Sequence, residues 1–279
     1  MSDIAEIKNT TEQLRAAARR LGGQARAASA AAAEYGKLTQ IPAHEAVQAK
    51  LFSQLAELNE LAGWCCFDSG ADRHARWYYR EAVTLAHQTG DHYRMASAMR
   101  FMGVVDGVRG NPESALKQYD MAQLILGPKG DPELIHWLHA VSAHDLAQMG
   151  HARATDELAK AGGGWQPSNA LERADMDYQT ALVYMQMGQP EKAERFVASI
   201  NGAGRHRPVG VFATVLRATA YVQTGEPKGL LMAKTAIDAV APLHSVRARE
   251  RLVPLAVALE ARPGSDAREL ARMARWVAA

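Results

Sequence analysis

The stretch from Glu60 to Gly90, ELAGWCCFDSGADRHARWYYREAVTLAHQTG, contains the pattern that decides the fold. It holds two segments rich in apolar and small residues, which end at Gly70 and Gly90. Neither segment alternates apolar and polar residues as a half-buried strand does. Gly63 lies seven positions before Gly70, and Ala75 lies five positions after it. Small residues at these places allow two helices to pack closely, so the stretch predicts a helix, a tight turn and a second, antiparallel helix.

The same pattern recurs along the chain with a period of about 40 residues. Five helix-closing glycines are separated by 40, 40, 38 and 37 residues: Gly70, Gly110, Gly150, Gly188 and Gly225. A small residue precedes each of them by seven positions: Gly63, Gly103, Ala143, Ala181 and Ala218. An aromatic residue follows nine positions after the first two glycines: Tyr79 and Tyr119. The third and fifth units depart from this frame, with Thr155 and Ala159 in the third and Leu230 and Lys234 in the fifth.

This arrangement of small and aromatic residues resembles the tetratricopeptide repeat. It predicts an all-α fold, a right-handed tetratricopeptide-like solenoid of helical hairpins with capping helices at both ends. Residues 1–42 are expected to form N-terminal capping helices broken near Gly22 and Gly23, residues 43–242 five degenerate repeats, and residues 243–279 C-terminal capping helices. Caps are expected because an end repeat otherwise exposes its apolar face.

Composition narrows the function classes. Acidic and basic residues nearly cancel, leaving a formal charge of +2, so no global charge favours nucleic acid. The only cysteines, Cys65 and Cys66, are neighbours in a helical pattern and are expected to be reduced and partly buried. No apolar run approaches the roughly 18 residues that a membrane-spanning helix needs. We therefore expect a cytoplasmic protein.

A solenoid of this type binds its partners in the concave groove lined by the first helix of each pair. In the repeat frame the candidate groove residues are Glu60, Trp64, Phe67, Asp68, Arg100, Trp137, His144, Asp175, Tyr178 and Phe212. Aromatic rings among acids and amides suit an extended peptide, a small molecule or a protein partner. An alternative reading makes Trp64 and Phe67 structural, packed against the N-terminal helices. A homodimer is also compatible with the sequence.

The sequence supports neither a metal site nor a set of catalytic groups. His136 and His139 have helical ligand spacing, but His144 lies off that face, so neither a metal nor a cofactor is expected. A second alternative is an enzyme on a helical scaffold with His144, Asp175 and Tyr178 as acid–base groups. No recognisable nucleophile–base motif supports it. The favoured interpretation is a non-catalytic binding module, regulatory or signal-receiving.

The stretch Glu60-Leu61-Ala62-Gly63-Trp64, continuing through Phe67-Asp68-Ser69-Gly70 to Gly90-Asp91, closely resembles the C-terminal domain of actinobacterial XRE-type helix-turn-helix regulators. The segment from Ser245 to Leu252 looks like the last helix of the same domain. The resemblance implies a tetratricopeptide-like sensor. Residues 1–50 do not resemble a DNA-binding domain, so direct DNA binding by this chain is not expected. The alternative function is therefore a transcriptional regulator whose helix-turn-helix part is missing or supplied by a partner.

Overall fold

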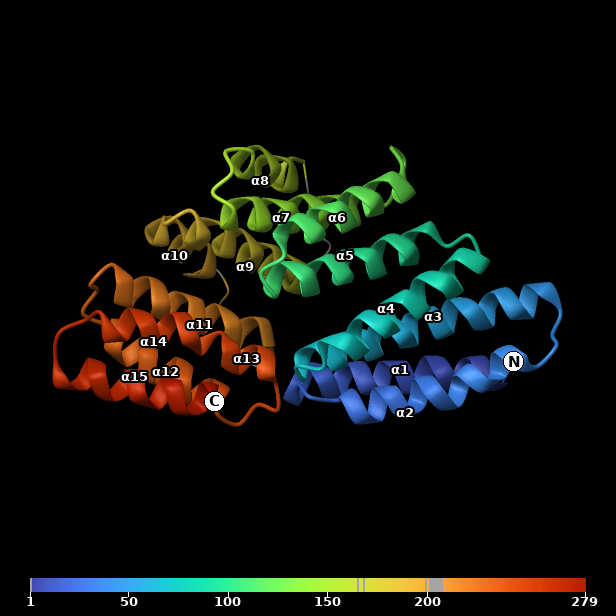
Figure 1. Ribbon diagram of the computed structural model, residues 1–279, viewed down its shortest axis with the longest axis horizontal. Coiled ribbons are helices and arrows are strands. Elements are labelled where there is room, and N and C mark those ends of the chain that lie inside the picture. The colour runs from blue at the N-terminus through green and yellow to red at the C-terminus, as the bar shows by residue number, and fades with distance from the viewer. Residues whose placement is uncertain (1, 165, 168, 199, 201–207) are drawn as a thin grey trace. The chain divides into compact units, whose positions relative to one another are not determined.

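The computed structural model describes residues 2–164, 166–167, 169–198, 200 and 208–279. Within these ranges the protein is all-α, with sequential helices packed as antiparallel pairs and no strand (Figure 1). The chain divides into two compact units, Met1–Leu138 and His139–Ala279. The expected boundaries between the capping helices and the repeats stay predictions.

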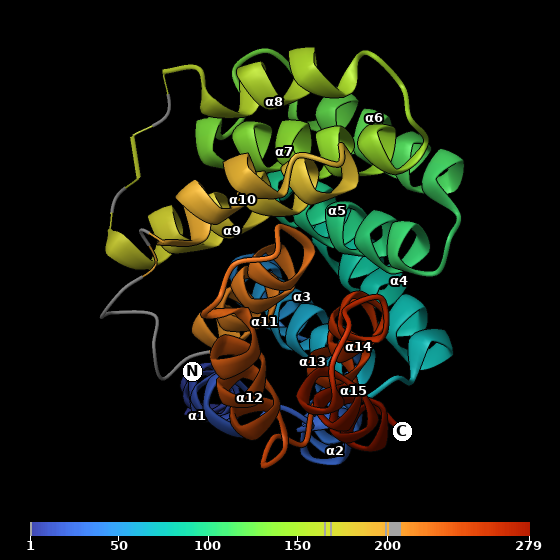
Figure 2. The ribbon, with the colours of Figure 1, turned by 90° about the vertical axis from the view of Figure 1, so that its left-hand side faces the viewer.

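The first unit begins with two helices that pack on a long third one. The helices are α1 (Ser2–Leu21), α2 (Ala25–Gly36), the short 3₁₀ helix η1 (Lys37–Gln40), α3 (Glu45–Asp68), α4 (Asp72–Gln88), α5 (His92–Val108), α6 (Pro112–Leu126) and the start of α7 (Pro132–Gln148). The break at Gly22 and Gly23 was predicted and is confirmed, since both glycines have positive φ between α1 and α2. Figure 2 shows α3 and α4 beside each other, as their contacts require.

The second unit contains the rest of α7 and the remaining helices. They are α8 (Ala154–Gly162), α9 (Ala170–Gln186), α10 (Pro190–Ala198), α11 (Pro208–Gln223), α12 (Gly229–Val240), α13 (Val246–Glu250), α14 (Leu252–Glu260) and α15 (Ser265–Ala278). Helices α9 and α10, α11 and α12, and α14 and α15 form contacting pairs. Helices are present in the C-terminal segment where the sequence predicts them, and Pro263 and Gly264 lie between α14 and α15.

All five predicted glycines end a helix in the same way. Each has a φ between 67° and 80°, a conformation that strains any other residue. The N–H of the residue after each glycine donates to the carbonyl five positions before it, at 2.8–3.0 Å: Ala71 to Cys66, Asn111 to Asp106, His151 to Leu146, Gln189 to Tyr184, and Glu226 to Tyr221. This bond, with the glycine's own N–H donating three positions back, is a Schellman motif. The predicted repeat of helix ends is confirmed.

The small residues form the seams between paired helices. A Cβ on Gly63 would lie 2.6 Å from Cε1 of the fully buried Tyr79, and one on Gly103 would overlap Tyr119 in the same way. The third and fifth units keep the pattern but start it one residue earlier. The residues buried there are Ala154 and Ala161 in the third unit, and Gly229, Ala233 and Ala236 in the fifth. The frame that placed Thr155, Ala159 and Lys234 at these positions is corrected, since all three are exposed.

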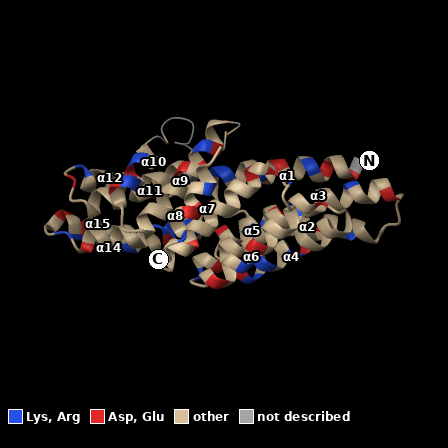
Figure 3. Ribbon diagram, turned by 90° about the horizontal axis from the view of Figure 1, so that it is seen from above, with Lys and Arg blue, Asp and Glu red and all other residues tan. Residues whose placement is uncertain are grey.

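Both units carry acidic and basic side chains intermixed along their helices (Figure 3). In the described part of the chain, no helix has the length and apolar character needed to cross a bilayer.

Candidate ligand-binding site

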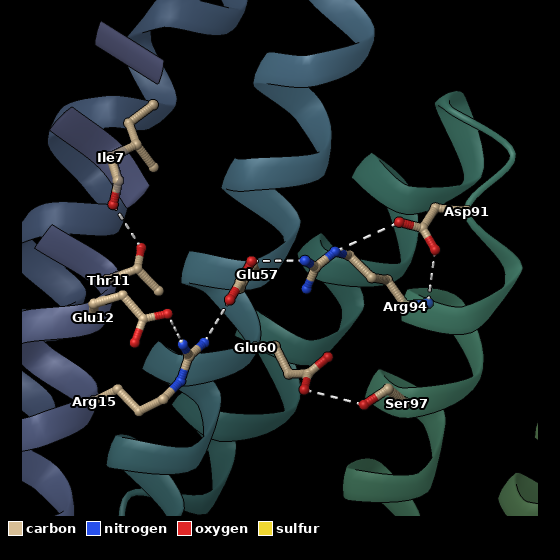
Figure 4. A network of polar contacts seen from close by, with 9 residues as sticks. All are labelled: Ile7, Thr11, Glu12, Arg15, Glu57, Glu60, Asp91, Arg94 and Ser97. Atoms are coloured by element: carbon tan, nitrogen blue, oxygen red, sulfur yellow. Dashed lines mark hydrogen bonds and ion pairs between the residues drawn. The ribbon is translucent and has the colours of Figure 1, made fainter. Parts of the chain in front are cut away.

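Helices α3 and α5 of the first unit carry facing rows of polar side chains (Figure 4). Glu57 and Glu60 lie three positions apart and share one face of α3. Glu57 accepts a hydrogen bond from Arg94 of α5 at 2.6 Å, and Glu60 accepts one from the hydroxyl of Ser97 at 3.0 Å. Both bonds join residues 37 positions apart in sequence. The two helices are therefore in register with an offset of 37 residues.

Glu57 is shared by two arginines (Figure 4). Its Oε1 accepts from Arg15 of α1 at 2.7 Å, while its Oε2 accepts from Arg94. Burial alone raises the pKa of Glu57, but the hydrogen bond from Arg15 and the charges of Arg94 and Arg15 outweigh it, so the pKa is lowered. Glu57 is thus an ionised carboxylate that ties α1, α3 and α5 together.

Glu60 lies one turn further along α3, and its electrostatic balance is the reverse. Burial raises the pKa of its carboxyl, and the charge of Arg100 with the hydrogen bond from Ser97 offsets this only in part. Glu60 and Arg100 are electrostatic neighbours without an ion pair within 4.0 Å. We call these two residues, with the aromatic side chains around them, the Glu60–Arg100 cluster. Its positive and negative groups lie near each other but form no ion pair.

Arg100 makes no hydrogen bond or ion pair with any residue that the structure describes. Its Nε is shielded from solvent and has no acceptor in the described ranges. The guanidinium carbon lies 4.1 Å from the ring centroid of Phe101 and 5.5 Å from that of Trp137 in α7, both cation–π distances. Burial lowers the pKa of Arg100, and the nearby Glu60 only partly opposes this. The side chain is positioned by aromatic rings, while its buried Nε–H has no acceptor among the described residues.

Tyr79 of α4 adds a second unsatisfied group. Its side chain is 0% exposed, and its hydroxyl has no hydrogen-bond partner among the described residues. The ring stacks on Phe101 with centroids 5.6 Å apart and lies against Gly63. Burial raises the pKa of Tyr79 well above its ordinary value, Glu60 raises it further, and Arg100 opposes the rise. Tyr79 is therefore a neutral, buried donor in the electrostatic neighbourhood of Glu60 and Arg100.

The other predicted residues of the first unit divide into two groups. Trp64 is half-buried, with its ring centroid 5.8 Å from that of Phe101, so it lies at the edge of the cluster. Phe67 is 2% exposed and packs in the core with residues of α1 and α2. Asp68 is buried as well, and its Oδ2 accepts a hydrogen bond from the N–H of Gly23 at 2.9 Å. Phe67 and Asp68 thus have packing roles, in agreement with the structural alternative that the sequence offered for Phe67.

In the second unit, the predicted residues Tyr178 and Phe212 surround an arginine that the site prediction omitted. Nε of Arg251, between α13 and α14, donates to the Tyr178 hydroxyl at 2.7 Å, and its guanidinium lies 4.1 Å from the centroid of Phe212. The two rings are 6.0 Å apart. Tyr178 and Phe212 therefore bind the chain's own C-terminal segment. Asp175 is half-buried on the same helix as Tyr178 and also takes part in contacts.

Two histidines of α7, His139 and His144, lie beside carboxylates. His139 Nδ1 lies 2.7 Å from Glu157 of α8, which also accepts from Lys160 at 2.7 Å. His144 Nδ1 lies 3.0 Å from the buried Asp145. Among the described residues, no group of three or more His, Cys, Asp or Glu side chains is arranged to hold a metal ion.

Sequence reasoning named Glu60, Arg100, Trp64 and Trp137, which the structure places in or beside one cluster of the first unit. It assigned Tyr79 only to packing, although the same aromatic also carries the unsatisfied hydroxyl. The repeat period of 40 between Gly70 and Gly110 aligns Glu60 with Arg100, whereas the hydrogen bonds join residues 37 apart, so the repeat frame did not predict these pairs.

Comparison with known proteins adds no relative: no protein-family model matches the chain, and no curated protein matches it. The resemblance to XRE-type regulators therefore rests on the quoted residues alone.

Proposed function

We propose that this chain is a tetratricopeptide-like repeat module that binds a ligand at the Glu60–Arg100 cluster, without catalysing a reaction. The repeated Schellman ends and the seams of small residues support the assignment to this repeat type. A right-handed solenoid with capped ends is part of the same proposal.

The observation that carries the binding role is the state of Arg100. A buried polar group without a partner is costly, so native structures rarely contain one unless it serves a purpose. Here two such groups, the Arg100 Nε and the Tyr79 hydroxyl, lie in one electrostatic neighbourhood beside the partly exposed ring of Trp64. A bound ligand supplies the acceptors that the described part of the chain lacks at these two groups.

The contacts of the second unit argue for binding in the first unit and against the catalytic alternative. Tyr178 is hydrogen bonded by Arg251, and His144 is held beside Asp145, so two of the three candidate acid–base groups already have structural partners. The likeness of residues 55–92 to a sensor domain favours a signal-receiving role, in which a ligand shifts the balance between conformations of the module.

The proposal is tested by thermal unfolding of the purified chain with fractions of a metabolite and peptide extract from its source organism. A ligand that binds only the folded state raises the Tm. We expect at least one fraction to raise it for the wild type and for Arg73→Gln, an exposed arginine on α4 of the same unit. The shift should be lost in Arg100→Gln and reduced in Trp64→Ala. The proposal is wrong if no fraction shifts the wild type, or if Arg100→Gln and Trp64→Ala respond fully.

A further inference from the structure

The lack of a partner for Arg100 follows from the register of the two helices. The offset of 37 residues that pairs Glu57 with Arg94 also brings Trp64 against Phe101. The same offset places Gly63 opposite Arg100. Gly63 has no side chain to offer, and the ring of Tyr79 fills the space where one would begin. Along this face of α3, Glu57 and Glu60 each offer an acceptor to α5, and Gly63 offers none.

The two unsatisfied groups have the same hydrogen-bonding character. The Arg100 guanidinium has only donors, and the neutral Tyr79 hydroxyl has a proton to donate. What the cluster lacks is consequently an acceptor, and beside a cation an anionic acceptor forms the stronger bond.

Charge and shape narrow the anion further. Arg94 is paired with Glu57, which leaves Arg100 as the cation near Glu60 without an ion pair among the described residues, so the cluster suits a single negative charge better than a dianion such as phosphate. The planar guanidinium matches the geometry of a carboxylate, which it binds through two parallel N–H groups. The rings of Phe101 and Trp137 lie at cation–π distance from Arg100, and Trp64 lies beside Phe101, so these rings offer apolar surface for the body that carries the carboxylate.

We propose that Arg100 and Tyr79 bind the carboxylate of a small organic acid, whose apolar body lies against the neighbouring aromatic rings. This inference rests on the proposed binding function and specifies the chemistry of its ligand.

Isothermal titration calorimetry of the full chain tests the proposal with three probes, benzoate, phenylacetate and hexanoate. Their amides, benzamide, phenylacetamide and hexanamide, match them in shape but lack the charge. Inorganic phosphate tests the preference for a single charge. A hexapeptide with a free C-terminus and its amidated form test whether a peptide end can supply the same group. We expect at least one acid to bind, and its amide and phosphate to bind far more weakly. If a peptide C-terminus reaches the cluster, the hexapeptide with a free end should bind more tightly than its amidated form.

Three variants assign the binding to the two donors. Loss of a hydrogen bond to a charged group weakens binding by about tenfold to a hundredfold, so Arg100→Gln and Tyr79→Phe should each lower acid affinity by at least tenfold. Tyr78→Phe is the matched control, since the Tyr78 hydroxyl points to the carbonyl of Ser29 in α2, and it should bind as the wild type does. Tyr79→Phe should keep or raise the Tm of the free chain, because it removes an unsatisfied hydroxyl. That result separates lost binding from lost folding.

The inference is overturned if none of the acids binds the wild type, if amides bind as tightly as acids, or if Arg100→Gln and Tyr79→Phe leave acid affinity unchanged. The proposed function fails separately, when no fraction of the cell extract stabilises the chain. An extract ligand that stabilises the wild type but not Arg100→Gln, together with silent acids, would retain the binding role and reject the carboxylate.

Discussion

Replacing Gly63 by alanine tests whether the seam between α3 and α4 is as tight as the structure indicates. The new Cβ would lie 2.6, 2.8 and 2.9 Å from three ring atoms of Tyr79, all inside normal contact distance. The ring cannot retreat, because it is fully buried and stacks on Phe101 on one side. Overpacking of this kind costs about 1–3 kcal/mol, and we expect the upper half of that range.

Helix propensity acts in the opposite direction. Alanine in a helix interior is favoured over glycine by about 1 kcal/mol. The net expectation for Gly63→Ala is therefore a loss of about 1–2 kcal/mol in the free energy of unfolding. Gly36, in α2 of the same unit, is the control, since a Cβ there meets nothing within 4 Å. Gly36→Ala should stabilise the chain or leave it unchanged.

A double-mutant cycle isolates the contact between Gly63 and Tyr79. The fourth unit has Ala181 and Val197 at the equivalent positions, a larger residue facing a smaller one. Gly63→Ala should therefore become neutral or stabilising when Tyr79 is valine, with a coupling energy of about 1–3 kcal/mol. Urea unfolding followed by circular dichroism measures all four chains. Equal effects of Gly63→Ala in both backgrounds, or a stabilising effect in the wild type, would refute the packing argument.

Four further predictions concern titration, reactivity and the second unit. Glu57→Gln should lower the free energy of unfolding by about 2 kcal/mol near neutral pH, because two arginines lose a charged acceptor. Since the folded pKa of Glu57 is lowered, its contribution is present above the unfolded pKa and is lost as the pH falls through the folded pKa, which urea titrations across acidic pH would detect. The opposite holds for Glu60, whose folded pKa is raised: the wild type should lose stability as the pH rises from the unfolded to the folded pKa, and Glu60→Gln should abolish this loss. The same pH slope in the variant and the wild type within that window would contradict this. Burial raises the pKa of Cys65 to about 12 and also raises that of Cys66, so Ellman's reagent should react far more slowly with the native chain than in urea, and rapid native reaction would show that the thiols are accessible. Arg251→Gln should destabilise the chain by about 1–3 kcal/mol, more than Tyr178→Phe does, because it loses both the hydrogen bond and the contact with Phe212. If the two variants lose the same free energy of unfolding, the cation–π contact with Phe212 contributes no stability.

The helix ends and seams could be predicted from the sequence because they depend on local chemistry. A glycine such as Gly110 closes a helix through its own positive φ, and a small residue such as Gly103 marks the place where the partner helix approaches. Both signals recur with one period, so each unit supports the interpretation of the others. The frame failed in the third and fifth units because one residue fewer separates the glycine from the buried Ala154 and Gly229.

The candidate site was only partly predictable, since it depends on which polar atoms find partners. The frame named Arg100 as a groove residue, which stays a prediction, and its lack of an acceptor among the described residues depends on the opposing Gly63 and on the depth of Tyr79. The pairing of Tyr178 with Arg251 joins residues 73 positions apart and follows no repeat period. Such contacts arise where the C-terminal segment folds back on its own unit, and periodicity carries no information about them.

The most direct test follows the Nε–H of Arg100 by NMR in the ¹⁵N-labelled chain, with Arg100→Lys to assign the signal. Because this group has no acceptor among the residues that the structure describes, its proton should move downfield and exchange more slowly with water when an acid such as benzoate is added. A signal that stays in place while calorimetry reports benzoate binding, or a shift confined to another arginine, would contradict the account.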